Sequence, residues 1–551
     1  MFKLLKILTI LLLGALNGTV YTQWSSQYEG HFTGDQPSTE SVAYSIAADS
    51  GYSYVVGYTS DMTGSSMCIV KYDVNGDTVW TSSFNGGEGQ FIENKAYAVV
   101  VDKLRNVIIT GYATTPNGID IATVKYSPSG VEQWARYYND SLNLDDKAYA
   151  ITLDAFNNIY ITGYTTVSQN ETQYIVIKYY QNGDSAWTRL GEGHHDTATS
   201  ITMVGNNYVA ITGRSLNNSS IPDIVTVLYD ANTGDQIWSS ALGLSANIDA
   251  KGNAITSDAY GNVYVTGYVT QPESGKDIVV IKYNTDGFLW EKTFEGNFDD
   301  IGNSIGLSAY GDVIVTGTTA ASDGSTNYLT ASYNSTGDLE WQKGYNGPGN
   351  ATDVAYKMAV STADNSVYVT GSSMSGTDEG STDMLTIKYD IATGDAIDSS
   401  RLSTSSANAD ISYDITIDQT QNVYITGFTL PTGGNNLNSG AKILTAKFNN
   451  FKKNNHKNTV SSVPKNFKLY QNYPNPFNPG TIIKFEVGKS SNVKLVVYDM
   501  VGKEVQTLIN NNYNPGTYTV NFNKPGIASG VYFYVLTAGE FRDIKKMILL
   551  K

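Results

Sequence analysis

One motif recurs eight times between Tyr44 and Phe448, and this repeat constrains the fold more than any other feature of the chain. Its clearest copy is DAYGNVYVTGY at residues 258–268. The glycines of the motif lie 50 to 56 residues apart, at Gly57, Gly111, Gly163, Gly213, Gly267, Gly317, Gly371 and Gly427. Because one repeat cannot bury its own apolar face, successive copies must stack on one another. A residue present in every copy is therefore assigned to packing before it is assigned to chemistry.

Each copy predicts four short strands. The first is rich in β-branched residues, as in AYAVVVD at residues 96–102, and it ends at a polar turn such as AYGN at residues 259–262. A second strand closes on the recurrent glycine, and after a variable connection a third strand follows, as in DIVVIKY at residues 277–283. A hairpin turn then leads to a fourth strand that carries tryptophan, as in LWEKTF at residues 289–294. Four antiparallel strands without helical periodicity are typical of one propeller blade.

The tryptophans predict how the propeller closes. All seven occupy the fourth-strand position, at Trp24, Trp80, Trp134, Trp187, Trp238, Trp290 and Trp341. Ile397 takes this place in the next copy, and the last copy ends at Phe448 without a fourth strand. Trp24 precedes the first full repeat, so a strand near residues 24–28 can complete the last blade and cover its open edge. We therefore predict an all-β fold with an eight-bladed β-propeller at residues 24–448, closed by an N-terminal strand.

The N-terminus has the pattern of a secretory signal peptide. Lys3 and Lys6 precede an apolar run from Ile7 to Leu16 that is too short to span a bilayer. We predict a signal peptide at residues 1–22, cleaved between residues 18 and 23, and no transmembrane segment. The single cysteine, Cys68, excludes an internal disulfide. We expect an exported monomer that is held together by its core.

Charge divides the chain into two parts. From residue 451 onward there are 14 basic and 5 acidic residues, whereas the rest of the chain has 22 basic and 47 acidic residues. The repeat region is thus strongly acidic, and this argues against nucleic acid as a partner. Residues 449–466 are polar and rich in asparagine and lysine, as expected for a flexible linker that a protease can reach.

The repeat resembles the secreted bacterial β-propeller repeat called SBBP, through the D-x-x-G-N-x-Y-V-T-G core quoted above. The resemblance covers roughly residues 42–448. That repeat is named for a seven-bladed propeller, whereas this chain has eight copies. The resemblance implies a propeller and little about ligand or activity.

The last segment predicts a small Ig-like β-sandwich at residues 467–551, because alternating strands are broken by Pro, Gly and Asn turns. It resembles the type A C-terminal sorting domain of type IX secretion nearly from end to end. The residues that carry the resemblance are Asn472, Tyr473, Pro474, Asn475, Pro476, Phe477, Asn478, Pro479 and Gly480, then YDMVG at residues 498–502, Gly516, Tyr518, Gly530 to Tyr532, Lys545, Lys546 and Lys551. The resemblance implies export across the outer membrane by the type IX machinery, followed by release or attachment at the cell surface.

Three motifs could suggest catalysis or metal binding. His194 and His195 lack a clear third metal ligand beyond Asp196 or Glu192. GNSIG at residues 302–306 matches a nucleophile motif but falls in a first strand with no helix after it. Asp73, Asn75 and Asp77 imitate a calcium loop, although its twelfth-position glutamate is absent and a hairpin turn explains them. We expect no cofactor and no catalytic residue, with a weak Ca²⁺ site in this turn as the alternative.

Ligand contacts are expected where the copies differ. The Lys-Tyr pairs of the third strands recur at Lys71, Lys125, Lys178, Lys282 and Lys388, each followed by tyrosine, and they are predicted to pack between blades. The connections between second and third strands vary and should share one face. They span residues 60–67, 114–118, 166–173, 215–222, 270–276, 319–327, 372–382 and 430–441.

Two classes of function follow. The first is a non-catalytic propeller, outside the cell or on the outer-membrane surface, that binds a protein, glycan or matrix component as an adhesion or scaffold module. The second is an extracellular enzyme. YDANTGDQIW at residues 229–238 resembles the tryptophan-docking repeat of quinoprotein dehydrogenases, although one cysteine cannot supply that family's adjacent cysteine pair. A glycosidase needs only two suitably placed carboxylates, and the sequence has many. We prefer the first class.

Overall fold

The computed structural model describes residues 22–30, 40–61, 63–87, 92–140, 142–216, 222–242, 249–272, 274–294, 296, 298–348, 351–374, 382–405, 408–431, 440–448, 467–472, 475–513 and 516–550. Within these ranges every regular element is a β-strand. The predicted linker lies outside the described residues, as does the predicted signal peptide except for Thr22. The chain divides into two compact units, one with most of β1–β32 and the other with β33–β39, and they are described separately.

The strands of the first unit follow the predicted fourfold repeat. The first strands are β2 (Glu40–Asp49), β6 (Asn94–Val101), β10 (Lys147–Leu153), β14 (His194–Val204), β18 (Ala250–Ser257), β22 (Asp300–Leu307), β26 (Asp353–Ser361) and β30 (Asn408–Ile417). The second strands are β3 (Tyr52–Asp61), β7 (Val107–Thr115), β11 (Ile159–Ser168), β15 (Tyr208–Leu216), β19 (Val263–Gln271), β23 (Val313–Ala320), β27 (Ser366–Met374) and β31 (Val423–Pro431). The third strands are β4 (Gly64–Tyr72), β8 (Gly118–Tyr126), β12 (Glu171–Tyr179), β16 (Pro222–Asp230), β20 (Gly275–Asn284), β24 (Thr326–Tyr333), β28 (Thr382–Asp390) and β32 (Lys442–Phe448). The fourth strands are β5 (Thr78–Phe84), β9 (Glu132–Tyr138), β13 (Ser185–Leu190), β17 (Gln236–Leu242), β21 (Gly287–Phe294), β25 (Leu339–Tyr345), β29 (Ala396–Leu402) and β1 (Thr22–Tyr28).

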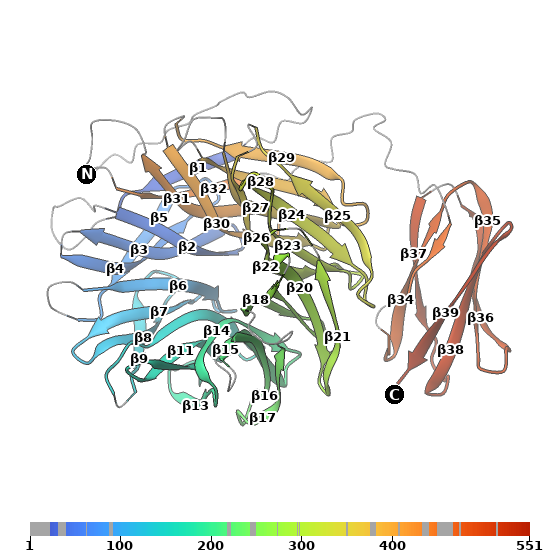
Figure 1. Ribbon diagram of the computed structural model, residues 1–551, viewed down its shortest axis with the longest axis horizontal. Helices are drawn as coiled ribbons and strands as arrows, with labels where there is room; N and C mark the ends of the chain where they lie inside the picture. Colours follow the sequence, from blue (N-terminus) through green and yellow to red (C-terminus); the bar gives the residue numbers. More distant parts are fainter. Residues whose placement is uncertain are drawn as a thin grey trace. The chain divides into compact units, whose positions relative to one another are not determined.

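Hydrogen bonds join these strands in groups of four. Six groups, from β2–β5 to β22–β25, are separate four-stranded sheets. β26–β29 and the group of β30, β31, β32 and β1 are joined into one sheet by a single bridge between Thr382 and Ala409. Figure 1 shows the groups succeeding one another around a centre, with labelled first strands such as β2, β6 and β18 innermost. The predicted all-β propeller is confirmed, whereas the exact number of blades stays a prediction.

The predicted pairing of the N-terminal strand with the last repeat is confirmed. β1 pairs antiparallel with β32, with Trp24 opposite Lys447 and Tyr28 opposite Ile443. The strand begins at Thr22, two residues earlier than predicted. Since β32 pairs with β31 on its other side, β1 supplies the fourth strand that the last repeat lacks.

The core lies between neighbouring groups of strands. Tyr54 and Met67 of the first group pack in one buried cluster with Val99 and Ile109 of the second group. Trp24 lies in the equivalent cluster between the last group and the first. Burial of both faces explains the near-continuous apolar runs of the second and third strands.

The structure corrects two predictions about strand ends. The second strands do not close on the recurrent glycine, because β7 continues past Gly111 to Thr115 and every other second strand continues in the same way. The connections to the third strands are therefore shorter than predicted, since β11 ends at Ser168 and β12 starts at Glu171. Parts of the longer connections, such as residues 375–381 and 432–439, lie outside the described residues.

The C-terminal unit is a sandwich of two antiparallel sheets. Its strands are β33 (Lys468–Leu469), β34 (Gly480–Val487), β35 (Ser491–Tyr498), β36 (Glu504–Tyr513), β37 (Gly516–Asn523), β38 (Gly530–Ala538) and β39 (Phe541–Leu549). One sheet has the order β33-β34-β37 and the other β36-β35-β38-β39. Phe485 and Phe522 of the first sheet share one buried cluster with Val497 and Leu536 of the second. The Ig-like class of this sandwich stays a prediction.

Candidate functional site

The recurrent glycine permits a β-bulge in each first strand. A Cβ atom added to Gly111 would lie 1.9 Å from the carbonyl oxygen of Lys95, and the pairing register of β6 and β7 shifts between Ala96 and Ala98. The same 1.9 Å approach recurs at the other seven glycines of the motif, Gly57, Gly163, Gly213, Gly267, Gly317, Gly371 and Gly427. No side chain fits at that distance, so only glycine lets the bulged strand lie this close. The glycine thus belongs to the scaffold.

The aspartate of the repeat locks the turn between the first and second strands. Oδ1 of Asp102 accepts hydrogen bonds from the backbone N–H groups of Leu104 (2.9 Å) and Asn106 (2.8 Å). Oδ2 of the same residue accepts a bond of 2.7 Å from the side-chain amide of Asn106. The same arrangement recurs at Asp154, Asp258 and Asp418. The D-x-x-x-N pattern is explained by turn geometry.

Tryptophan and lysine of one blade fasten it to the next. Trp80 Nε1 and Lys71 Nζ both donate to the backbone oxygen of Pro128, each at 3.0 Å. We call this pair of hydrogen bonds to one backbone oxygen the blade latch. The blade latch also joins Trp24 and Lys447 to Val74, Trp134 and Lys125 to Gln181, and Trp187 and Lys178 to Ala231. The predicted packing role of the Lys-Tyr pairs is confirmed, because the lysine and the tyrosine of every pair are buried.

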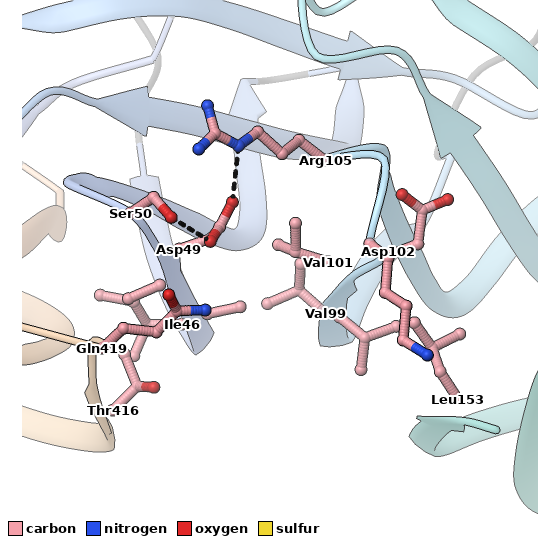
Figure 2. A pocket seen from close by; sticks show the side chains of 14 residues that line it. Ile46, Asp49, Ser50, Val99, Val101, Asp102, Arg105, Leu153, Thr416 and Gln419 are labelled. Carbon is pink, nitrogen blue, oxygen red and sulfur yellow. Dashed lines mark hydrogen bonds and ion pairs between the residues drawn. The ribbon is translucent and has the colours of Figure 1, made fainter. Parts of the chain in front are cut away.

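A cavity of 730 Å³ opens where the turns after β2, β6 and β30 and the end of β10 meet (Figure 2). Its walls come from these four first strands and from the three turns. The lining combines apolar side chains with polar ones. They include Ile46, Asp49, Ser50, Val99, Val101, Asp102, Lys103, Arg105, Leu153, Thr416 and Gln419. The exposed part of this lining is mainly polar and includes no aromatic side chain.

The carboxylates of the cavity are paired with cations. Arg105 Nε lies 3.1 Å from Asp49 Oδ2, and the Ser50 hydroxyl donates to Asp49 Oδ1 at 2.8 Å. Lys125 lies 3.0 Å from Asp102 in a fully buried ion pair. Arg105 has φ of 64° at a turn position where the last copy has Gln421, with φ of 66°, and several others have Gly or Asn. This conformation costs a non-glycine residue about 1 kcal/mol or more. Asp49 and Asp102 thus serve ion pairs and turns rather than forming the free acid pair that glycoside hydrolysis uses.

The bulge leaves one unpaired residue in each first strand, and this position differs between copies. Tyrosine occupies it in five copies, threonine in one and asparagine in two. These residues are Tyr44, Tyr97, Tyr149, Thr199, Asn253, Tyr356 and Tyr413, and Asn303 takes the equivalent place in β22, two residues after the Ile301 oxygen that Gly317 approaches. All eight are half-buried. The sequence signal for them is a small residue followed by Tyr, Thr or Asn, and the sequence alone did not single it out.

The remaining motifs do not assemble into a catalytic or metal site among the described residues. His194 Nδ1 contacts Glu171 Oε1, and His195 is exposed with φ of 50°. Within the described part of the chain, no group of three or more His, Cys, Asp and Glu residues could hold a metal ion. The GNSIG motif lies in β22, as predicted. Asp73 Oδ1 caps a hairpin turn by accepting from Asn75 N (2.8 Å) and Asp77 N (2.9 Å).

In the C-terminal sandwich, the predicted sorting segment clamps the last strand. Asn475 Oδ1 accepts from Ile548 N at 2.8 Å, and Asn475 Nδ2 donates to Lys546 O at 3.2 Å. Phe477 adds two backbone bonds, donating to Ile548 O (2.9 Å) and accepting from Leu550 N (3.0 Å). The segment and β39 therefore form one unit, although they lie about seventy residues apart in the sequence.

Burial separates structural from accessible residues of the predicted sorting signal. Asn472, Phe477 and Tyr532 are buried, and Tyr518 is half-buried. The residues exposed to a partner are Pro476, Asn478, Pro479, Gly530 and Lys546, while Asn475, Gly480 and Lys545 are half-buried. Gly516 begins β37. Tyr473, Pro474 and Lys551 lie outside the described residues, and the recognition role of the set stays a prediction.

Family comparisons agree with this architecture. Residues 471–550 match the family described as a secretion system C-terminal sorting domain. Residues 133–168 match the family described as a beta-propeller repeat. The chain is a β-propeller repeat protein with a type IX sorting domain. Residues 223–463 also match the family of the outer membrane protein assembly factor BamB.

The sorting domain places the propeller protein outside the cell or on its surface, as predicted, with the type IX machinery as its export partner. Among the described residues, no helix has the length and apolarity needed to cross a bilayer. The exported chain therefore carries an acidic repeat region and a basic sorting domain to the extracellular side.

Several solved structures are similar in fold. PorZ, a surface component of the type IX secretion system of Porphyromonas gingivalis, shares 10% identity over 92% of this chain and 86% of its own, with a TM-score of 0.31. The WD40 domain of SCAP from fission yeast shares 11% identity over 75% of this chain and 97% of its own, with a TM-score of 0.40. A polysaccharide lyase shares 10% identity over 67% of this chain and 92% of its own, with a TM-score of 0.41. At these values the likeness carries no functional argument. None of the curated proteins matches the sequence.

Proposed function

We propose that the propeller is a non-catalytic binding module that the sorting domain delivers to the extracellular side. Its ligand is a protein, glycan or matrix component, and the protein acts as an adhesion or scaffold element. The observation that carries the proposal is the chemistry of the cavity lining. The lining offers apolar surface and hydrogen-bonding groups, while its two carboxylates, Asp49 and Asp102, are each paired with a cation.

The pairing of these acids weighs against the glycosidase alternative. A general acid needs a carboxyl group whose pKa is raised, and a nucleophile or base needs a free carboxylate. Asp49 and Asp102 are instead engaged in ion pairs, Asp49 with Arg105 at 3.1 Å and Asp102 with Lys125 at 3.0 Å. The repeated tryptophans also have a structural explanation in the blade latch, so they do not by themselves support a quinoprotein dehydrogenase.

The test uses the full chain with a fluorescent label. It is incubated with intact cells of the exporting organism and with separated protein and polysaccharide fractions of their surface. In parallel, the unlabelled chain is assayed with chromogenic glycosides and for dye-coupled oxidation of alcohols and sugars. We expect saturable retention on one fraction and no turnover. Reproducible turnover, or retention no greater than that of the heat-unfolded chain, contradicts the proposal.

A further inference from the structure

The tyrosines at the bulge positions form a continuous arc of rings. Tyr356 contacts Tyr413 with ring centroids 5.4 Å apart, and Tyr413 is stacked on Tyr44 at 5.9 Å. Tyr44 contacts Tyr97 at 5.0 Å, and Tyr97 contacts Tyr149 at 5.4 Å. These five residues, here called the tyrosine arc, link five successive blades across strands that are distant in sequence. The arc runs through first strands, which lie innermost in the propeller (Figure 1).

The other three bulge residues link neighbouring blades by hydrogen bonds. Thr199 Oγ1 donates to Gly252 O at 2.6 Å. Asn253 Nδ2 donates to Gly302 O at 3.0 Å, and Asn303 Nδ2 donates to Ala355 O at 2.8 Å. The circle of eight bulge residues is thus divided into an aromatic part and a short polar part.

The scaffold does not require the tyrosines. The same glycine approach of 1.9 Å occurs in the aromatic part, at Gly111, and in the polar part, at Gly267. The bulge is therefore compatible with threonine, asparagine or tyrosine at this position. Tyrosine occupies this position in five adjacent copies, although two other residue types occupy it elsewhere in the repeat region. Positions that differ between repeats are where repeat proteins place recognition.

Further aromatic rings and polar groups lie next to the arc residues, on the second strands and near the starts of the first strands. Tyr58 and Tyr112 contact arc residues of their own blades, Tyr44 and Tyr97, at 5.9 and 5.8 Å. Lys95 Nζ lies over the Tyr58 ring at 4.7 Å, and Lys147 Nζ lies over the Tyr112 ring at 4.8 Å. The Tyr112 hydroxyl donates to Glu93 at 3.3 Å, and Lys147 pairs with Asp145 at 3.3 Å. Both signs of charge are present, so the surroundings present mixed polar groups rather than a cluster of cations.

We propose that the tyrosine arc is a stacking platform for a neutral polysaccharide that lies along the first strands. Half-buried tyrosine rings offer flat apolar faces to the C–H groups of pyranose rings. Hydroxyl, carboxylate and ammonium groups around the arc match the hydrogen-bonding hydroxyls of a sugar. A polyanionic chain is disfavoured by the excess of 47 acidic over 22 basic residues up to residue 450. The inference rests on the proposed binding function and names its ligand class.

The test measures binding of neutral hexasaccharides to the full chain by calorimetry, with cello-, laminari-, manno- and chitohexaose as the probes. The double variant Tyr44→Ala/Tyr97→Ala removes two adjacent rings. Tyr97→Phe keeps the ring and removes only the hydroxyl. Tyr180→Ala removes an exposed tyrosine outside the arc and is the matched control, since Tyr180 is 50% exposed.

We expect at least one hexasaccharide to bind, a tenfold or greater loss of affinity in the double variant, and less than a threefold change in Tyr97→Phe and Tyr180→Ala. If the double variant does not fold, Tyr149→Ala at the end of the arc replaces it. The inference is overturned if no hexasaccharide binds at millimolar concentration, or if the arc variants bind as the unmodified chain does. Retention on a surface protein fraction without hexasaccharide binding would reject the glycan while leaving the proposed binding function standing. Absence of both hexasaccharide binding and retention on any surface fraction would reject the two proposals together.

Discussion

Replacing Trp24 with alanine tests whether β1 closes the propeller. Trp24 is 5% exposed and lies between Tyr72 and Tyr424, with ring centroids 5.6 and 6.3 Å away. Its Nε1 donates to Val74 O at 3.0 Å, in the turn of the first blade. Tyr72 belongs to the first group of strands and Tyr424 to the last, so this one side chain joins the two ends of the propeller.

The expected cost follows from the buried ring and the hydrogen bond. Truncation of a buried tryptophan to alanine destabilises proteins by about 3–5 kcal/mol. The lost hydrogen bond adds little, because Lys447 Nζ still donates to Val74 O at 3.3 Å and keeps that oxygen paired. We therefore expect the free energy of unfolding to fall by about 3–5 kcal/mol.

Trp187 provides a matched control inside the propeller. It is 8% exposed, it lies 5.9 Å from Tyr160 and 6.3 Å from Tyr229, and it donates to Ala231 O at 3.3 Å. Urea unfolding of the full chain, followed by circular dichroism, compares Trp24→Ala with Trp187→Ala. Closure by β1 predicts similar losses for the two variants. A loss below about 1 kcal/mol for Trp24→Ala, beside a full loss for Trp187→Ala, would refute the closure.

Three further perturbations test the scaffold. Gly111→Ala places a Cβ 1.9 Å from Lys95 O and should lower the free energy of unfolding by about 1–3 kcal/mol or more. Gly344→Ala is the control and should be nearly neutral, because the nearest atom to its added Cβ is 3.7 Å away. Equal urea midpoints for the two variants would contradict the bulge argument. Burial raises the pKa of Asp146 to about 6, so the folded chain binds more protons than the unfolded chain between pH 4 and 6, and stability should fall as pH rises through that window. Asp146→Asn should flatten this part of the stability profile, and an unchanged slope would contradict the assignment. Burial raises the pKa of the Cys68 thiol to about 12, so it should resist a disulfide reagent at pH 8 until urea unfolds the chain; rapid labelling of the folded protein would contradict its position in the core.

The local part of the fold could be predicted because each repeat carries its own turn and strand signals. The unpaired Trp24 and the missing fourth strand after Phe448 also predicted the pairing of β1 with β32. The ends of the second strands were predicted wrongly. Glycine usually marks the end of a strand, but at Gly111 it allows close approach to a bulge in the middle of one.

The candidate site could not be predicted because it forms between blades. Asp49 and Arg105 belong to successive repeats, and their ion pair depends on how the two turns are placed around the centre. The tyrosine arc could not be predicted from the sequence for a related reason. A tyrosine in five of eight copies resembles a packing residue until the bulge shows that it has no ladder partner.

The most direct test of the account is a hydrogen-exchange footprint of the full chain with its captured surface ligand. If repeated residues build the scaffold and binding uses the positions where copies differ, exchange should slow in the first strands of the arc, at residues 42–46, 95–99, 147–151, 354–358 and 411–415. Exchange in β14, β18 and β22 should change little. Protection confined to the sandwich, or spread equally over all eight first strands, would contradict it.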